Sequence, residues 1–271
     1  EHMLSSSSVH GLFALGTTSE FMKISYDERK AIVQALGEIP NREKPITVNV
    51  GGLPVKQMLE LSAFALERKI DALTIVLPDS VQPDPESVFT YLDPIRKANY
   101  PFLLYWTPAY SRHRSDMAVV EKLLEIPSFV GLKDSSQDMV VFTDLCTQYG
   151  QEISIFQGVE MLHLCSLAVG SAGVVGGGLN VYPRLLADIT TAFTHGDLDK
   201  ARALQRQVNR HWEQISVGDT FRSACKHYWK TQGLLKGAYS RMGKNLASEL
   251  ELDPSYAQLV ALCHACASIS F

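Results

Sequence analysis

Residues 46–78, ITVNVGGLPVKQMLELSAFALERKIDALTIVLP, contain the strand–helix–strand pattern that indicates the fold of this chain. Residues 46–50 and 72–77 are short runs rich in β-branched and apolar side chains, which is typical of buried parallel strands. Residues 55–68, between them, have the apolar spacing of an amphipathic helix. A strand, a helix and a second strand in this order predict a parallel strand pair joined by a right-handed crossover.

The same alternation continues along the chain. Further strands are predicted at residues 12–15, 102–106, 129–133, 153–157 and 172–175, and further helices at 26–36, 85–97, 117–124, 139–148 and 161–169. Ser25 and Glu28 form a capping-box pattern where the first of these helices begins. Repetition on this scale favours a TIM (β/α)8 barrel. An open doubly wound sheet is the alternative, although no G-x-G-x-x-G follows an early strand and no P-loop occurs.

The pattern contains seven strands, whereas a closed barrel of this type has eight. Residues 1–6 look helical, so either the first strand is missing from this sequence or the fold compensates for two unpaired edges. After residue 181 the pattern is helical to the end, with segments at 184–194, 198–216, 221–233 and 254–267. We therefore expect a barrel over residues 1–195 and a helical region packed on it over residues 196–271.

Composition excludes several classes of protein. The chain has 271 residues, 46% of them hydrophobic, and a net charge of −4 without a basic cluster, so nucleic acid and anionic membranes are not expected partners. No apolar run is long enough to span a membrane and no signal peptide is visible, which indicates a cytoplasmic protein. The five cysteines are scattered, and Cys263 and Cys266 form a C-x-x-C in what looks like a terminal helix. We therefore expect all five to be reduced thiols that pack in the interior of the protein.

Lys133 is the first candidate for chemistry. It ends the predicted strand FVGLK, and alternation points its side chain into the barrel among apolar neighbours. A charged amine is costly there, which favours a neutral amine able to attack a carbonyl and form an imine. The alternatives are pairing with Asp134 or Glu160, or an extended side chain that reaches solvent.

Tyr105 ends a neighbouring strand, where a phenol could act as acid and base beside the imine; alternatively it is a core aromatic. Gly16, Thr17 and Thr18 form a strand-to-helix turn whose amides and hydroxyls could hold a carboxylate, or a plain turn. Residues 176–178 are three glycines that either permit close substrate approach or supply positive φ in a loop. The histidines lie on unrelated segments, so neither a metal nor another cofactor is expected.

Five segments add up to a family resemblance. They are GLFALGTTSEF at residues 11–21, LLYWTP at 103–108, VGLKDSS at 130–136, FQGVE at 156–160 and GSAGVVGGGLNVYP at 170–183. In this order and spacing the chain resembles the superfamily of N-acetylneuraminate lyase and dihydrodipicolinate synthase, pyruvate-dependent class I aldolases and lyases. The resemblance implies a TIM barrel with a C-terminal helical region, commonly a homotetramer; a homodimer is the other assembly we expect.

The resemblance also implies roles for individual residues. Lys133 would form the Schiff base with pyruvate or another 2-oxo acid, and Tyr105 would donate and accept protons. Thr17 and Thr18 would bind the substrate carboxylate, with Thr17 also in the proton relay. Binding would further involve the backbones of Gly158 and Val175 at the pyruvate end and the carboxyl of Glu160 near the aldehyde partner.

Departures from the family pattern bear on the substrate. Dihydrodipicolinate synthases place a relay tyrosine where this chain has Ser80, and an arginine where it has Tyr110, with Arg112 nearby. Sialic acid lyases have a second acid and a serine where this chain has Met161 and Gly177. The family's first strand and most of its first helix are also absent, for which a truncated sequence or gene model is the simplest explanation.

We therefore expect a Schiff-base-forming lyase that cleaves or forms a carbon–carbon bond of a 2-oxo acid, with a small aldehyde as partner. The alternatives are an authentic dihydrodipicolinate synthase, an authentic N-acetylneuraminate lyase, or a catalytically idle paralogue that binds a 2-oxo acid. The lost relay tyrosine and the missing strand support the idle paralogue. The retained Lys133, Tyr105 and Thr17 support the enzyme, because a decayed site would be expected to lose at least one of them.

Overall fold

A computed structural model describes residues 4, 8–108, 111, 114–215, 220–241 and 261. Residues 10–176 belong to one compact unit and the residues from 177 onward to a second. The boundary predicted between residues 195 and 196 stays a prediction. The helices predicted at residues 1–6 and 254–267 lie, almost entirely, outside the described residues.

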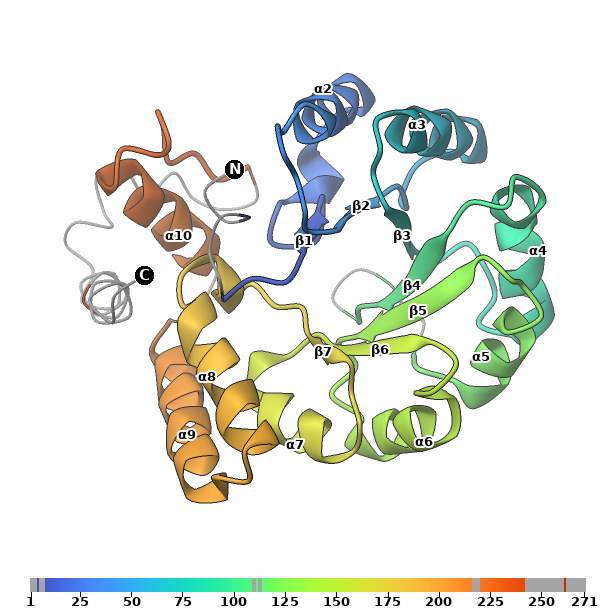
Figure 1. The fold of residues 1–271 in the computed structure, drawn as a ribbon. Coiled ribbons are helices and arrows are strands. Elements are labelled where there is room, and N and C mark those ends of the chain that lie inside the picture. Colours follow the sequence, from blue (N-terminus) through green and yellow to red (C-terminus); the bar gives the residue numbers. More distant parts are fainter. Residues whose placement is uncertain are drawn as a thin grey trace. The chain divides into compact units, whose positions relative to one another are not determined.

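The first unit contains a seven-stranded parallel sheet whose strands pair in chain order. The strands are β1 (Leu12–Ala14), β2 (Ile46–Asn49), β3 (Ala72–Val76), β4 (Phe102–Trp106), β5 (Phe129–Asp134), β6 (Ser154–Gln157) and β7 (Gly173–Val174). This confirms the seven predicted strands. The sheet curves into a half-barrel in which β1 and β7 are the end strands (Figure 1).

Helices follow the strands and lie on the outer side of this sheet (Figure 1). They are η1 (Phe21–Lys23), α2 (Tyr26–Gly37), α3 (Val55–Glu67), α4 (Pro85–Lys97), α5 (Met117–Leu123), α6 (Met139–Tyr149), η2 (Glu160–Leu162) and α7 (His163–Ala168). The predicted capping box is present, because Ser25 accepts from the Glu28 amide and the Glu28 carboxylate accepts from the Ser25 amide.

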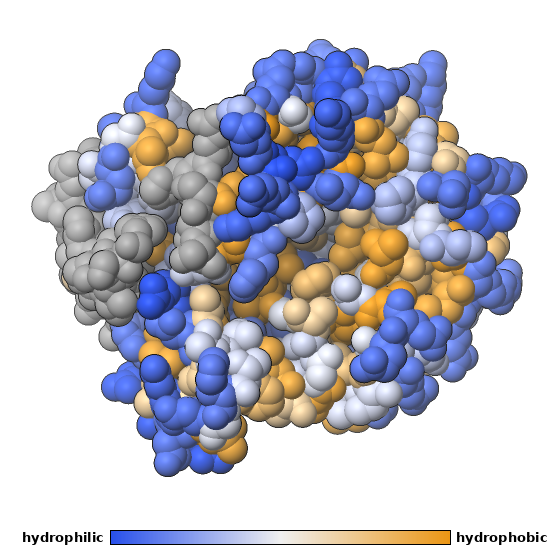
Figure 2. All heavy atoms as spheres, viewed as in Figure 1, coloured by the Kyte–Doolittle hydropathy of each residue, from blue (hydrophilic) through white to orange (hydrophobic). Residues whose placement is uncertain are grey.

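Polar side chains lie at the outer rim, and apolar ones gather toward the middle of the view in Figure 2.

Strand alternation separates an outer core from an inner face. Buried outward side chains such as Val48, Ile75 and Leu132 face the helices, where Met58 and Leu92 are also fully buried. Burial of this apolar surface supplies the main driving force for folding. The residues between the outward positions point into the half-barrel.

The second unit is helical. It contains η3 (Gly178–Asn180), α8 (Pro183–Thr194), α9 (Leu198–Ile215) and α10 (Thr220–Thr231), and α8 packs against α9. The Trp229 indole donates to the Asn180 carbonyl over 3.0 Å, which ties α10 to the start of this unit. Within the described part of the chain, every helix is too short or too polar to cross a lipid bilayer.

Candidate active site

Lys133 and Tyr105 lie side by side on the inner face of the sheet. The register of β4 and β5 pairs these two residues directly. The Lys133 amine is 4.2 Å from the centre of the Tyr105 ring and 4.6 Å from that of Phe13, and Lys133 is only 6% exposed. Lys133 forms no ion pair with any described residue. The two alternatives for this lysine, an ion pair with Asp134 or Glu160 and an extended side chain that reaches solvent, are therefore wrong.

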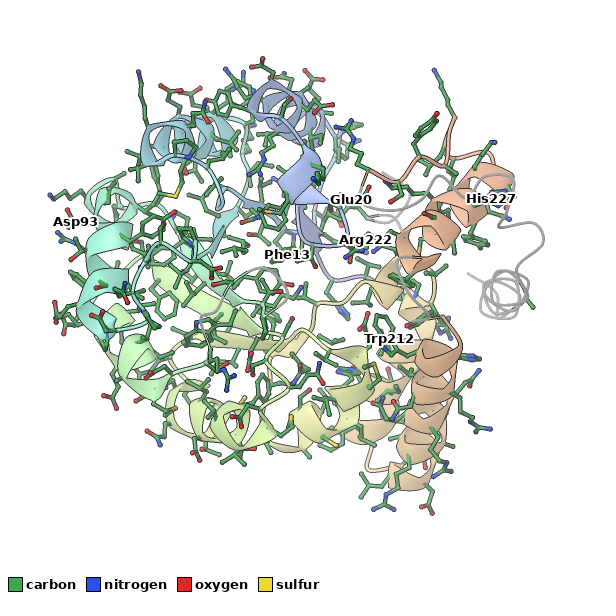
Figure 3. All side chains as sticks on the ribbon, turned by 180° about the vertical axis from the view of Figure 1, so that it is seen from behind. Phe13, Glu20, Asp93, Trp212, Arg222 and His227 are labelled. Atoms are coloured by element: carbon green, nitrogen blue, oxygen red, sulfur yellow. The ribbon has the colours of Figure 1, made fainter. Side chains whose placement is uncertain are left out.

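Phe13 is a site residue that the sequence did not single out. It lies on β1, where Figure 3 labels it. Its ring meets that of Tyr105 edge to face, with the two ring centres 5.5 Å apart. The ammonium form of a lysine beside two aromatic rings is attracted to them by cation–π interactions without a carboxylate partner. A carboxylate at that position would instead bind the ammonium form tightly and oppose its use as a nucleophile.

Asp134 points to the opposite face from Lys133, as strand alternation requires. Its carboxylate accepts from the Ser136 amide over 2.7 Å and from the Ser136 hydroxyl over 2.9 Å. Burial raises the pKa of Asp134, although the hydrogen bonds from Ser136 and Ser115 oppose the shift. Burial and the Asp134 charge raise the pKa of Cys146 to about 11, so this buried thiol is inert at neutral pH.

Thr17 and Thr18 belong to a turn fixed by its neighbours. Leu15 adopts a left-handed φ of 57°, and a Cβ at Gly16 would lie 2.8 Å from the Phe13 ring, so only glycine lets the turn fold over that ring. The buried side chain of Asn49 donates to the Leu15 carbonyl over 3.1 Å and accepts from the Gly51 amide over 3.0 Å. The end of β2 therefore holds the turn in place.

Hydroxyl groups surround the Tyr105 phenol. The Thr17 hydroxyl lies 3.4 Å from the phenol oxygen. Burial works to raise the pKa of Tyr105. The nearby Lys133 charge and hydrogen bonds with Thr17, Thr107 and Ser135 outweigh burial and lower the pKa below its ordinary value. The phenol is therefore set to give up its proton more readily than a tyrosine in water.

Gly158 follows β6 and lies against the lysine. A Cβ here would be 2.0 Å from the Ser135 hydroxyl, 2.8 Å from the Asp134 carbonyl and 3.0 Å from Cε of Lys133. The Gly158 amide already donates to the Asp134 carbonyl over 2.7 Å. Only glycine fits this space, which leaves its carbonyl as the group it can offer a ligand.

The remaining predicted residues lie in the same unit. Glu160 is buried, and its carboxylate lies so near Gly176 that a Cβ there would be 2.3 Å from Oε1. The close approach of the Glu160 side chain thus explains why residue 176 is glycine. The Val175 amide donates to the Gln157 carbonyl over 2.8 Å, extending the ladder beyond β7.

The positions that differ from the family pattern are only partly described. Ser80 is exposed after β3, Met161 is half-buried in η2, and Gly177 belongs to the second unit. Tyr110 and Arg112 lie outside the described residues, as do Cys263 and Cys266.

Comparisons with known proteins identify the family of the chain. The family model described as the Dihydrodipicolinate synthetase family matches residues 1–251. A 4-hydroxy-tetrahydrodipicolinate synthase from Methanopyrus kandleri is 30% identical over 202 residues, which are 74% of this chain and 67% of that protein.

Two solved structures share the fold. YagE, a prophage protein of the dihydrodipicolinic acid synthase family from E. coli K12 solved with pyruvate, matches with a TM-score of 0.83 at 21% identity, covering 95% of this chain and 87% of its own. A catalytic-lysine mutant of sialic acid aldolase from Ruminococcus gnavus matches with a TM-score of 0.87 at 18% identity, covering 96% and 86%.

A half-barrel of parallel strands with a buried lysine, a phenol and a hydroxyl-rich turn at its carboxyl edge defines a lyase of the class I aldolase type. Enzymes of this type form a Schiff base between a lysine and a carbonyl substrate, which is pyruvate in the dihydrodipicolinate synthetase family. The chain belongs to the dihydrodipicolinate synthetase family.

Proposed function

We propose that this chain cleaves or forms the bond between C3 and C4 of a 4-hydroxy-2-oxo acid through an imine on Lys133. The carrying observation is the Lys133 amine, buried 4.2 Å from the Tyr105 ring centre and outside any ion pair with the described residues. Such an amine does not have to leave a carboxylate before it attacks a ketone.

The reaction follows from these two side chains. The Lys133 amine attacks C2 of the oxo acid, and Tyr105 donates the proton with which the carbinolamine hydroxyl leaves as water. The protonated imine then accepts the electron pair of the C3–C4 bond, while the Tyr105 phenolate takes the proton of the C4 hydroxyl. The aldehyde departs, the enamine gains a proton at C3 from Tyr105, and hydrolysis of the imine releases pyruvate.

The binding roles rest on position. The hydroxyls and amides of Thr17 and Thr18 hold the substrate carboxylate, because their turn lies beside the phenol. The carbonyls of Gly158 and Val175 line the pyruvate end, since their amides are used in the ladder. Glu160 accepts from a hydroxyl of the aldehyde partner.

The wider setting belongs to the same proposal. We expect the sheet to be completed to a TIM (β/α)8 barrel and the enzyme to work in the cytoplasm as a homotetramer or homodimer, without a metal or other cofactor. The similarity in fold to barrel aldolases supports the first point.

Borohydride trapping tests the mechanism. Incubation with pyruvate and borohydride should add a lactyl-sized mass to the peptide containing Lys133, and Lys133→Met should abolish it. Lys122→Met is a matched control, because Lys122 lies outside the site and pairs with Glu86 and Glu125. A folded wild-type sample with no adduct would refute the imine mechanism.

A substrate panel separates the enzyme from its rivals. Release of pyruvate from small 4-hydroxy-2-oxo acids supports the proposal. Preference for N-acetylneuraminate, or condensation of pyruvate with aspartate semialdehyde, would instead identify one of the two specialised enzymes. Saturable binding of 2-oxo acids without turnover would identify an idle paralogue.

A further inference from the structure

A second pair of inward side chains stands directly above Tyr105 and Lys133. Alternation along β4 and its extension turns Tyr105 and Thr107 to the same side, and alternation along β5 and its extension does so for Lys133 and Ser135. The Ser135 amide donates to the Trp106 carbonyl over 2.9 Å, so the ladder between these strands continues one step beyond them. Thr107 and Ser135 are therefore neighbours at the mouth of the half-barrel.

The two hydroxyls are turned toward the reacting groups. Both hydroxyls contribute, with that of Thr17, to lowering the pKa of the Tyr105 phenol, and the Thr17 hydroxyl lies 3.4 Å from the phenol oxygen. The Ser135 hydroxyl and Cε of Lys133 lie 2.0 Å and 3.0 Å from the place that a Cβ on Gly158 would occupy, so they border the same small space. Thr107 is buried, whereas Ser135 is half-buried.

We propose that Thr107 and Ser135 are positioning residues for proton transfer by Tyr105. Thr107 holds the phenol oxygen in place and donates to it when it is a phenolate. Ser135 receives a proton from the phenol while passing its own hydroxyl proton to water. The reverse transfer returns a proton from water to the phenolate. This proposal rests on the imine mechanism above and completes the proton relay with hydroxyls of a single chain.

The test uses Thr107→Val, which keeps the shape and removes the hydroxyl, and Ser135→Ala. Two readouts are measured as a function of pH: exchange of the pyruvate methyl hydrogens with deuterated water, and the NMR titration of ¹³C-labelled Tyr105, assigned through Tyr105→Phe. Lys133 is the charged group that acts on the phenol in the described structure, so its borohydride adduct is measured in parallel.

Each variant should still form the adduct, but its phenol should titrate about half a unit to one unit higher, because one hydrogen bond to the phenolate is lost. The rising limb of the exchange profile should move by the same amount. Thr107→Ser should restore it. Thr74→Val is the matched control: it removes a buried hydroxyl bonded to Thr47 and should leave the Tyr105 titration unchanged.

The outcomes separate the two proposals. A wild type without an adduct overturns the imine mechanism and this relay with it. A wild type with an adduct, combined with variants whose Tyr105 titrates as in the wild type, overturns the relay alone. Ser135→Ala changes a half-buried position and decides the matter if Thr107→Val does not fold.

Discussion

Replacing Gly158 with alanine should damage both stability and imine formation. The new methyl group would lie 2.8 Å from the Asp134 carbonyl, 2.0 Å from the Ser135 hydroxyl and 3.0 Å from Cε of Lys133. The serine can rotate away. The carbonyl cannot, because it accepts the ladder hydrogen bond from the amide of residue 158 itself. The backbone and the lysine must therefore move.

The magnitude follows from this crowding. Inserting a methyl group into a packed interior costs about 1–3 kcal/mol of unfolding free energy. Displacement of a reacting group by about 1 Å lowers the rate by about a hundredfold. Because Cε of Lys133 has to shift by only part of that distance, we expect imine formation to slow by about ten- to a hundredfold.

Adding borohydride at set times after mixing with pyruvate measures the rate of adduct formation, and urea unfolding measures the stability. Gly237→Ala is the control, because a Cβ at Gly237 meets no atom within 4 Å and the residue has no positive φ. A Gly158→Ala variant that forms the adduct at the wild-type rate, with unchanged stability, would show that the crowding argument is wrong.

Two further changes test the supports of the site. Asn49→Ala should lower the free energy of unfolding in urea by about 1–3 kcal/mol, because it leaves the buried Leu15 carbonyl without its donor. It should also raise the pyruvate concentration needed for half-maximal trapping. An unchanged pyruvate concentration would show that the turn does not contribute to substrate binding. Asp134→Asn keeps an acceptor for the Ser136 amide and removes a carboxyl whose pKa is raised by burial. Because the folded state favours the protonated acid, wild-type stability relative to this variant should be greatest in acid and fall as pH rises above about 4; the opposite trend in urea unfolding would contradict the raised pKa.

The order of strands and helices could be predicted from local sequence patterns. The two-residue period of strands such as β3 and the helical period of α3 follow from burial on one side of each element, so they are readable without a fold. Lys133, Tyr105 and Thr17 were singled out because polar groups at the ends of apolar strands are unusual, and their roles were predicted from the family resemblance.

Which of these groups lie together depends on the three-dimensional fold. The register of β4 with β5 set Tyr105 beside Lys133 and Thr107 beside Ser135, and no local pattern contains that register. Phe13 looked like an ordinary core residue, since its role depends on a lysine 120 positions away in the chain. Contacts between distant segments depend on how the strands align and how the sheet curves, and these are fixed by packing across the whole unit.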